Sequence, residues 1–391
     1  MLAAGWLVAA TFLWRTTVPG GLRLSGLDEH RYFSASLLAR ASSYGRFTTW
    51  NEIASMVVLV LVLAAWARWG ARWMRESAAG PIGTGMLLGM LGLALVWLAQ
   101  VPFSMAQLWW ERRYGLSDAG YLAYLTQNWA ALGGEFLFVS FALLVVMGFA
   151  RFLGERWWLV GAPFFAGLAV LFAFVSPWLQ PSVRALRDPV LAREARTLER
   201  AEGAAPTPVK VEEVGDLTTV PNAVTTGLGP SRQIIIWDTL LDGRFSDREV
   251  RVVLAHEIGH VARSHIWKAL GWYALLALPG AYLIARTTRR RGGMARPEAV
   301  PLSLFVLVVL GVLATPLENV VSRRFEAEAD WLALRGARDP AAQIELFRHF
   351  ARTSLDEPDP SFADYVLFEN HPTIMQRIAM AEAWRKRDAS R

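Results

Sequence analysis

The sequence contains no cysteine and is poor in histidine and lysine. Without cysteine the chain can form no disulfide and can bind no metal through thiolates. Any metal site must therefore use histidines and carboxylates, and only six histidines are present. Lysine occurs only at Lys210, Lys268 and Lys386, so nearly all of the 40 basic residues are arginine. This bias is typical of a GC-rich bacterial coding sequence.

Hydrophobic residues make up 54% of the chain, and many of its 18 tryptophans stand beside apolar runs, as residues that anchor a protein at a membrane interface do. A sequence pI of about 9.9 would also suit a nucleic-acid-binding protein. Many arginines, however, flank the apolar runs, so anchoring at a membrane surface is the better interpretation. We expect the lipid bilayer as a partner and no nucleic acid.

Seven apolar runs are long enough, or nearly so, to cross the hydrocarbon core, which needs about 20 residues. They are Leu2–Leu13, Ile53–Trp69, Ile82–Ala106, Ala131–Ala150, Trp157–Leu179, Trp267–Ala285 and Leu302–Thr315. The first run is short, and a signal-like segment is the alternative. No small-residue cleavage site follows it cleanly, so we interpret it as an anchor.

The rest of the chain is polar and falls into two segments. Residues 182–265 are charged and contain two runs with strand character, Val209–Val214 and Gln233–Trp237. Residues 318–391 form the second polar segment. The predicted organisation is therefore five spans in 1–181, a soluble segment in 182–265, two spans in 266–317 and a soluble C-terminal segment in 318–391. This is an all-α polytopic membrane protein with a small α+β portion.

The segment His256–His260 has the pattern His-Glu-x-x-His. On a helix, a spacing of four places both imidazoles on one face, one turn apart, where they can bind one Zn²⁺. Glu257 can then take a proton from a metal-bound water. Ser246, with Glu249 three residues later, is a capping-box signature and predicts that the helix starts there. A chance helical histidine pair is the alternative.

A catalytic zinc needs a third protein ligand besides the two histidines. Glu326, Glu328 and Asp330 lie on a second predicted helix downstream. Glu326 and Asp330 are four residues apart and share a face, whereas Glu328 points away. We therefore expect Glu326 to bind the metal, Asp330 to accept a hydrogen bond from a ligand histidine, and Glu328 to be dispensable for metal binding. A solvated acidic helix face is the alternative.

The segment Asn222–Leu228 has the character of extended backbone ahead of the zinc helix. An extended edge beside such a helix can pair with the backbone of a peptide substrate, which makes Ala223 a candidate for substrate contact. Asn222 can point its amide at the oxyanion that forms on attack. A structural asparagine in a turn is the alternative.

These motifs, with others in the chain, resemble one family. His-Glu-Ile-Gly-His followed by the segment Ser322–Asp330, Ser-Arg-Arg-Phe-Glu-Ala-Glu-Ala-Asp, is similar to the type I CAAX prenyl proteases, which are integral-membrane zinc metallopeptidases. Residues 110–117, 222–241 and 371–378 are similar to three further stretches of that family. The resemblance runs in order from about residue 110 to 380, and a bacterial heat-shock membrane protease is a more distant cousin.

The resemblance implies a ring of helices around a chamber, one Zn²⁺ per chain and an active site on the cytoplasmic side. It also implies that His371 is a donor to the transition state and that Arg377 orients it or binds a carboxylate. A plain surface salt bridge is the alternative for Arg377. Residues 216–221 depart from the family pattern, which leaves prenyl-peptide specificity open. Arginine counts on the two sides do not decide the orientation.

Together these features predict a membrane-embedded zinc endopeptidase of the gluzincin type in a bacterial inner membrane. The expected partners are peptide or protein substrates, a lipidated C-terminal peptide among them. Two alternatives stay open: a quality-control protease for membrane proteins, and a membrane sensor with a signalling zinc peptidase domain. A transporter-like chamber with an inactive site is disfavoured by Glu257, because a structural zinc needs no base. The physiological substrate and the oligomeric state are not predicted.

Overall fold

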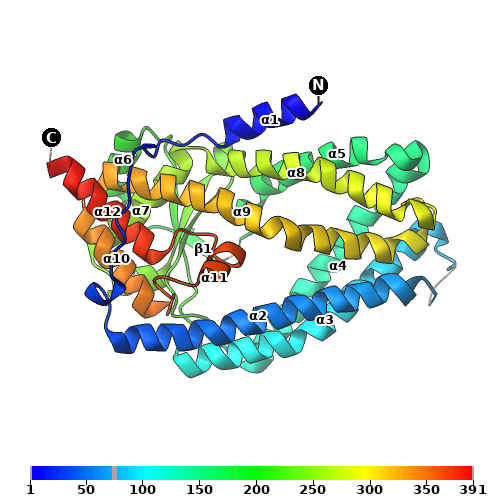
Figure 1. Cartoon of the computed structure of the whole chain (residues 1–391), viewed down its shortest axis with the longest axis horizontal. Coiled ribbons are helices and arrows are strands. Elements are labelled where there is room, and N and C mark those ends of the chain that lie inside the picture. Colours follow the sequence, from blue (N-terminus) through cyan, green and yellow to red (C-terminus); the bar gives the residue numbers. More distant parts are fainter. Residues whose placement is uncertain (1, 73–76, 181, 390–391) are drawn as a thin grey trace.

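The computed structural model describes residues 2–72, 77–180 and 182–389. Within this part of the chain, six helices have the length and apolar content of membrane spans. They are α2 (Ala35–Trp69), α3 (Gly80–Tyr114), α4 (Tyr121–Leu153), α5 (Trp158–Val175), α8 (His265–Thr288) and α9 (Val300–Ala337). Figure 1 shows the long helices along the long axis of the molecule, with the strands and most of the shorter helices gathered at one end. Each of the six contains one of the predicted runs or most of it.

The first predicted run, Leu2–Leu13, is helix α1, with the predicted bounds. Its 12 residues are fewer than the about 20 that cross a bilayer. The helix lies beside α8, where the Trp6 indole donates a hydrogen bond to the Leu275 carbonyl at 3.1 Å. The prediction of about seven spans is thus confirmed as six full-length spans and one short helix beside them.

Several spans are longer than a bilayer requires. Helix α9 has 38 residues, which at 1.5 Å per residue is about 57 Å, whereas the hydrocarbon core is about 30 Å thick. The sequence predicted a span at Leu302–Thr315 and a separate helix around Glu326. The structure joins them into one helix that continues through Pro316. A membrane span therefore extends directly into the end of the molecule that holds the strands, and it carries Glu326 there. The sequence predicts that this end lies outside the lipid, and it is called the soluble end below.

The soluble end contains a four-stranded sheet. Its strands are β1 (Val183–Ala185), β2 (Val209–Glu212), β3 (Ala223–Thr226) and β4 (Gln233–Trp237), in the order β1-β2-β4-β3. β2 and β4 are parallel, and the two outer pairs are antiparallel. The predicted strands at 209–214 and 233–237 are confirmed. β3 is an edge strand, hydrogen-bonded to β4 on one side only.

Five further α-helices in the part of the chain that the structure describes lie at the same end of the molecule as this sheet, and one of them, α7, packs against its edge strand β3. They are α6 (Pro189–Glu202), α7 (Asp247–Ala262), α10 (Pro340–Thr353), α11 (Phe362–Leu367) and α12 (Ile374–Ala389). The predicted capping box starts α7: Glu249 N–H donates to Ser246 Oγ, and Ser246 N–H donates to Glu249 Oε2 at 2.9 Å. Leu254 and Ile258 of α7 are fully buried in the core that α6, α7, β4 and the end of α9 share.

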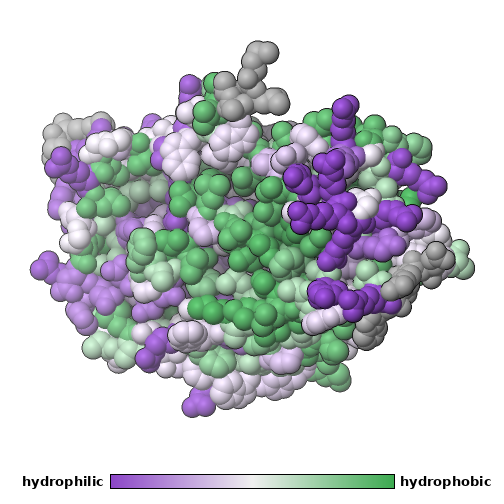
Figure 2. All heavy atoms as spheres, turned by 45° about the vertical axis from the view of Figure 1, so that its right-hand side comes forward, coloured by the Kyte–Doolittle hydropathy of each residue, from purple (hydrophilic) through white to green (hydrophobic). Residues whose placement is uncertain are grey.

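The span surfaces are mostly exposed and apolar. At most 28% of the residues in the most apolar stretch of any span are buried inside the protein. Figure 2 shows apolar side chains across the middle of one face, with hydrophilic side chains gathered towards its two sides. Exposed apolar area on this scale is stable in lipid rather than in water. The chain is an integral membrane protein.

Candidate metal centre

Three predicted ligands lie together at the soluble end. His256 and His260 come from α7 and Glu326 from α9, and one ligand atom of each lies within 4.8 Å of the others. The two histidine Nε2 atoms are 3.0 Å apart. Glu326 Oε2 lies 3.1 Å from His256 Nε2, and Glu326 Oε1 lies 3.5 Å from His260 Nε2. All three side chains are at most 15% exposed.

Gly259 allows the two helices to approach this closely. A Cβ at Gly259 would lie 3.2 Å from Ala329 Cα and 3.3 Å from the Ala329 carbonyl oxygen, tighter than ordinary van der Waals contact. Because Ala329 sits between Glu328 and Asp330, this contact sets the depth at which the α9 carboxylates meet α7. The glycine of the His-Glu-x-x-His segment thus has a packing role.

The donor set fits a tetrahedral metal ion. Bonds of about 2.0–2.1 Å would place two tetrahedral ligand atoms roughly 3.3 Å apart. The two imidazole nitrogens are 3.0 Å apart, and each faces a different oxygen of the Glu326 carboxylate, at 3.1 and 3.5 Å. Glu326 Oε2 is buried between two imidazole nitrogens, His256 Nε2 at 3.1 Å and His371 Nε2 at 3.2 Å, so a cation bound among them would satisfy its charge. Two histidines and one carboxylate leave a fourth position for water, which is the pattern of catalytic sites.

Asp330 lies behind His256, as predicted. His256 Nδ1 is 2.9 Å from Asp330 Oδ1, so its other nitrogen, Nε2, faces the metal position. Arg377 of α12 donates two hydrogen bonds to Asp330, at 2.7 and 2.8 Å. Its side chain is only 12% exposed. Arg377 therefore binds the Asp330 carboxylate in the protein interior, which differs from a surface salt bridge.

The pKa values of the two ligand histidines shift in opposite directions when no metal is bound. Burial alone would lower the pKa of His256, but hydrogen bonds to Asp330 and Glu326 outweigh it and raise the pKa to about 10. Burial lowers the pKa of His260 below its usual value. A metal ion that binds here must therefore displace a proton from His256, because metal-bound imidazole is the neutral form.

His371 approaches the centre from its open side. It lies in the loop before α12, and its Nε2 is 3.2 Å from Glu326 Oε2, while Asn370 Oδ1 is 2.6 Å from its Nδ1. Its side chain is 47% exposed, in contrast to the three ligands. This position is compatible with the predicted donor role, which stays a prediction.

Glu257 is buried beside the edge strand. Thr225 of β3 reaches it, with its Oγ1 2.8 Å from the Glu257 carboxylate and 3.0 Å from the Glu257 carbonyl oxygen. Sequence reasoning missed Thr225, although it lies inside the predicted extended edge. The signal that could have found it was a hydroxyl on the strand expected to run past the base.

The remaining predicted residues lie at the start of that strand. The Asn222 side-chain oxygen accepts a hydrogen bond from Ala223 N–H at 2.9 Å, and its carbonyl accepts one from Trp237 N–H. Asn222 is exposed, and these hydrogen bonds do not involve the three ligands. Ala223 pairs with Ile236 of β4. Asn222 and Ala223 thus lie at the start of the edge strand β3 rather than against the metal ligands.

An apolar groove of about 400 Å³ runs beside the end of this edge. Its lining comes from α5, the loop after β3 and the start of α8, with Leu228, Gly229 and Trp267 among its residues. The same three residues also line a small hollow that reaches His260. Gly227 shapes the loop, because its φ is +83° and a Cβ there would overlap the Ser231 carbonyl. The groove therefore leads towards the metal centre.

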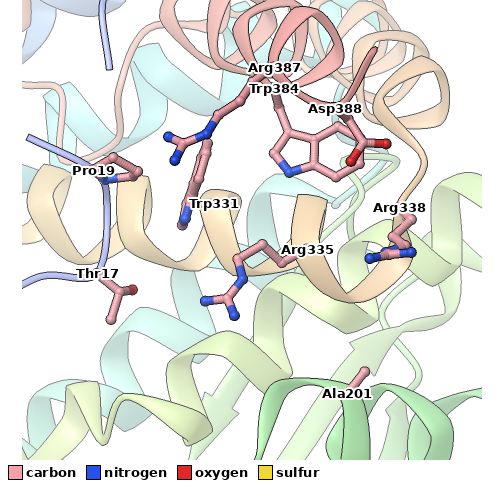
Figure 3. A pocket seen from close by; sticks show the side chains of 9 residues that line it. All are labelled: Thr17, Pro19, Ala201, Trp331, Arg335, Arg338, Trp384, Arg387 and Asp388. Carbon is pink, nitrogen blue, oxygen red and sulfur yellow. The ribbon is translucent and has the colours of Figure 1, made fainter. Parts of the chain in front are cut away.

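A larger cleft, of about 560 Å³, lies elsewhere. It is lined by Thr17, Pro19, Ala201, Trp331, Arg335, Arg338, Trp384, Arg387 and Asp388. Figure 3 shows these side chains between the end of α9, α12 and the chain near residues 17–19. None of the three ligands lines it, so its size does not mark the reactive centre.

Comparisons with known proteins place the chain among metalloproteases. The uncharacterized metalloprotease YhfN of Bacillus subtilis is 31% identical over 242 residues, 58% of this chain and 57% of that one. A CAAX prenyl protease 1 homolog of Oryza sativa is 27% identical over 170 residues, 41% of this chain and 40% of that one. Protease HtpX of Acinetobacter baumannii is 29% identical over 184 residues, 40% of this chain and 60% of that one.

These matches span about half the length of those relatives. The fold extends further: the crystal structure of S. mikatae Ste24p matches with a TM-score of 0.72 at 16% identity, and covers 97% of this chain and 96% of that one.

The fold and the site define a polytopic helical membrane protein in which a span completes a metallopeptidase-type metal site. The chain belongs to peptidase family M48, which it matches over residues 185–385, just over half of its length. The predicted resemblance to type I CAAX prenyl proteases is thereby confirmed at the level of the family. Membership implies a bound metal.

Proposed function

We propose that the protein is a membrane-embedded endopeptidase that uses one Zn²⁺ per chain. The observation that carries this proposal is the arrangement of His256, His260 and Glu326 with a buried carboxylate, Glu257, next to the first ligand. Two neutral imidazoles and one carboxylate suit zinc. A purely structural site would need neither the open fourth position nor the adjacent base.

The roles of the side chains follow from their positions. When bound, zinc polarises the scissile carbonyl and lowers the pKa of a water molecule to about 7. Glu257 takes a proton from the attacking water and returns it to the leaving amine, while Thr225 holds its carboxylate in orientation. His371, at the open side, donates a hydrogen bond to the oxyanion. Asn222 is the second proposed donor, and its amide must turn away from Ala223 to serve.

The substrate is an extended segment with apolar or lipidated groups. β3 is an edge strand beside the zinc helix, so a peptide can pair with it through main-chain hydrogen bonds. The apolar groove at Leu228 and Trp267 adjoins this edge and would receive an apolar side chain or a lipid group. Spans that enclose a chamber would restrict entry to unfolded segments.

The proposed location is a bacterial inner membrane with the metal centre on the cytoplasmic side. Support comes from the scarcity of lysine in the sequence. The two spans α8 and α9 leave residues 182–265 and 338–389 on the same side of the membrane, and the resemblance to type I CAAX prenyl proteases implies that this side is the cytoplasm. The segments 182–265 and 318–391 then assemble one site, and the end of α9 belongs to both the membrane and the soluble portions.

Cleavage-site mapping tests this proposal. Purified full-length protein is incubated with a prenylated CAAX peptide, its unprenylated twin and an unfolded membrane protein, each with and without a zinc chelator. We expect chelator-sensitive cleavage and a preference for the prenylated over the unprenylated peptide. Cleavage of the unfolded protein alone would favour the quality-control alternative. Absence of chelator-sensitive cleavage with all three substrates would refute the proposed activity.

A further inference from the structure

Glu328 lies on α9 between Glu326 and Asp330, and it is completely buried. Its Oε1 accepts hydrogen bonds from Thr17 N–H at 2.6 Å, the Thr17 hydroxyl at 2.9 Å and Arg263 Nε at 2.9 Å. Its Oε2 lies 3.0 Å from His265 Nε2 and 3.2 Å from Lys268 Nζ. Backbone N–H, arginine and lysine can only donate, so Glu328 is a charged carboxylate.

A carboxylate at this position determines which ring nitrogen carries the proton, first on His265 and then on His260. Because Glu328 has no proton to give, His265 carries its proton on Nε2 and leaves Nδ1 as an acceptor. His265 Nδ1 lies 2.9 Å from His260 Nδ1, so His260 carries its proton on Nδ1 and donates it. The lone pair of His260 is then on Nε2, which lies 3.0 Å from His256 Nε2 at the metal position.

We propose that His265 and Glu328 are positioning residues that hold His260 in the tautomer and ring orientation required to bind the metal. The inference rests on the proposed metal site and concerns residues outside it. Asp330 does the same for His256 by direct contact. For His260 the Glu328 carboxylate acts through the imidazole of His265. Thr17, in the segment after α1, donates two hydrogen bonds to the other oxygen of that carboxylate.

A purely structural role is the competing explanation. His265 stacks on Phe325 with ring centroids 4.7 Å apart and an interplanar angle of 13°, so it also contributes to packing. Metal affinity separates the two roles, because packing alone does not depend on which nitrogen of His260 carries the proton.

Glu328→Gln is the decisive variant, because glutamine keeps the shape and replaces one acceptor oxygen with a donor NH₂. If the NH₂ faces His265, the proton order along both histidines is reversed, and His260 Nε2 loses its lone pair. If the NH₂ faces Thr17 and Arg263, it is placed against groups that are themselves hydrogen-bond donors. We expect zinc affinity to fall about 10–100-fold, the usual loss when a partner of a ligand histidine is removed.

The measurement is competition for Zn²⁺ between the purified full chain and a chromophoric chelator, with the thermal midpoint of the metal-free chain measured in parallel. Glu249→Gln is the matched control, since Glu249 is a buried carboxylate on α7 that pairs with His349 and does not contact a ligand. We expect the control to bind zinc as the wild type does. Unchanged affinity in Glu328→Gln would overturn the proposal.

A second pair of variants covers a folding defect. His265→Asn keeps an acceptor oxygen near the place of Nδ1, whereas His265→Leu removes it. We expect tighter zinc binding by the asparagine variant, and a cobalt-loaded spectrum closer to that of the wild type. Equal affinities would refute the positioning role of His265.

Glu326→Ala separates a failure of this proposal from a failure of the proposed metal site. If Glu326→Ala binds zinc like the wild type, the metal site itself is wrong. If Glu326→Ala loses zinc while Glu328→Gln binds zinc normally, only the positioning role of His265 and Glu328 is wrong.

Discussion

At the scale of single residues, the orientation of the base is the first feature open to test. Thr225 contacts the Glu257 carboxylate at 2.8 Å. Thr225→Val removes this hydroxyl at nearly constant shape, so we expect turnover to fall about tenfold, or about 1.4 kcal/mol in the barrier, with normal zinc content. Thr225→Ser, which keeps the hydroxyl, serves as the control. Zinc loss in the valine variant would assign Thr225 to metal binding instead.

Asp330 allows a second test at this scale. It accepts hydrogen bonds from His256 and from Arg377. Asp330→Asn removes the charge that holds the His256 proton on Nδ1, so zinc affinity should fall about 10–100-fold. Asp242→Asn, at an exposed aspartate paired with Arg244, should leave zinc affinity unchanged. Equal affinity in both variants, measured by chelator competition, would show that Asp330 does not support the ligand.

At the scale of helices and strands, much of the architecture could be predicted. The capping box at Ser246 and the strand at Gln233–Trp237 depend on local sequence, and both appear as expected. Helical phasing also brought Glu326 and Asp330 to one face. Phasing could not show what covers the other face, so Glu328 was expected to be dispensable, whereas the structure buries it against residues from α8 and the segment after α1.

The bounds of α9 were missed for a related reason. Apolar content marked only the part in lipid, Leu302–Thr315, and the polar change near Glu318 suggested a boundary. Helical backbone hydrogen bonds do not depend on which solvent surrounds the side chains, so the helix continues from one environment into the other.

The contact between α7 and α10 yields a prediction on stability. The Asp339 carboxylate accepts hydrogen bonds from Ala342 N–H, which caps α10, and from Arg248 of α7. Burial alone would raise the pKa of Asp339, but these two partners lower it overall. Asp339→Ala should therefore cost about 0.5–2 kcal/mol at neutral pH, and Asp339→Asn less, because asparagine also caps helices.

The stability that the Asp339 carboxylate contributes changes with pH in a definite direction. The unfolded aspartate has a pKa of about 3.9 and the folded one a lower value. Its contribution is thus present at neutral pH and is lost as the pH falls through the folded pKa. Unfolding of the wild type and of Asp339→Ala should be followed at neutral pH and at about pH 3. The difference between their free energies of unfolding should be smaller at about pH 3. A constant difference would mean that the charge of Asp339 contributes nothing.

At the scale of the whole molecule, orientation is open to test because the chain has no cysteine. Single cysteines placed at two exposed arginines report on opposite ends: Arg290, at the turn between α8 and α9, and Arg196, on α6. In intact bacterial cells, an impermeant maleimide should label Arg290→Cys, and it should label Arg196→Cys only after permeabilisation. The opposite pattern would place the metal centre outside the cytoplasm.

The central claim is that a zinc ion held by His256, His260 and Glu326 works with Glu257 as its base. The most direct measurement is zinc content and peptidase turnover on one preparation each of the wild type and Glu257→Gln. Because Glu257 activates water without binding the metal, the variant should keep about one zinc per chain and lose most of its turnover. Turnover equal to that of the wild type would contradict the account, as would the loss of zinc from the variant.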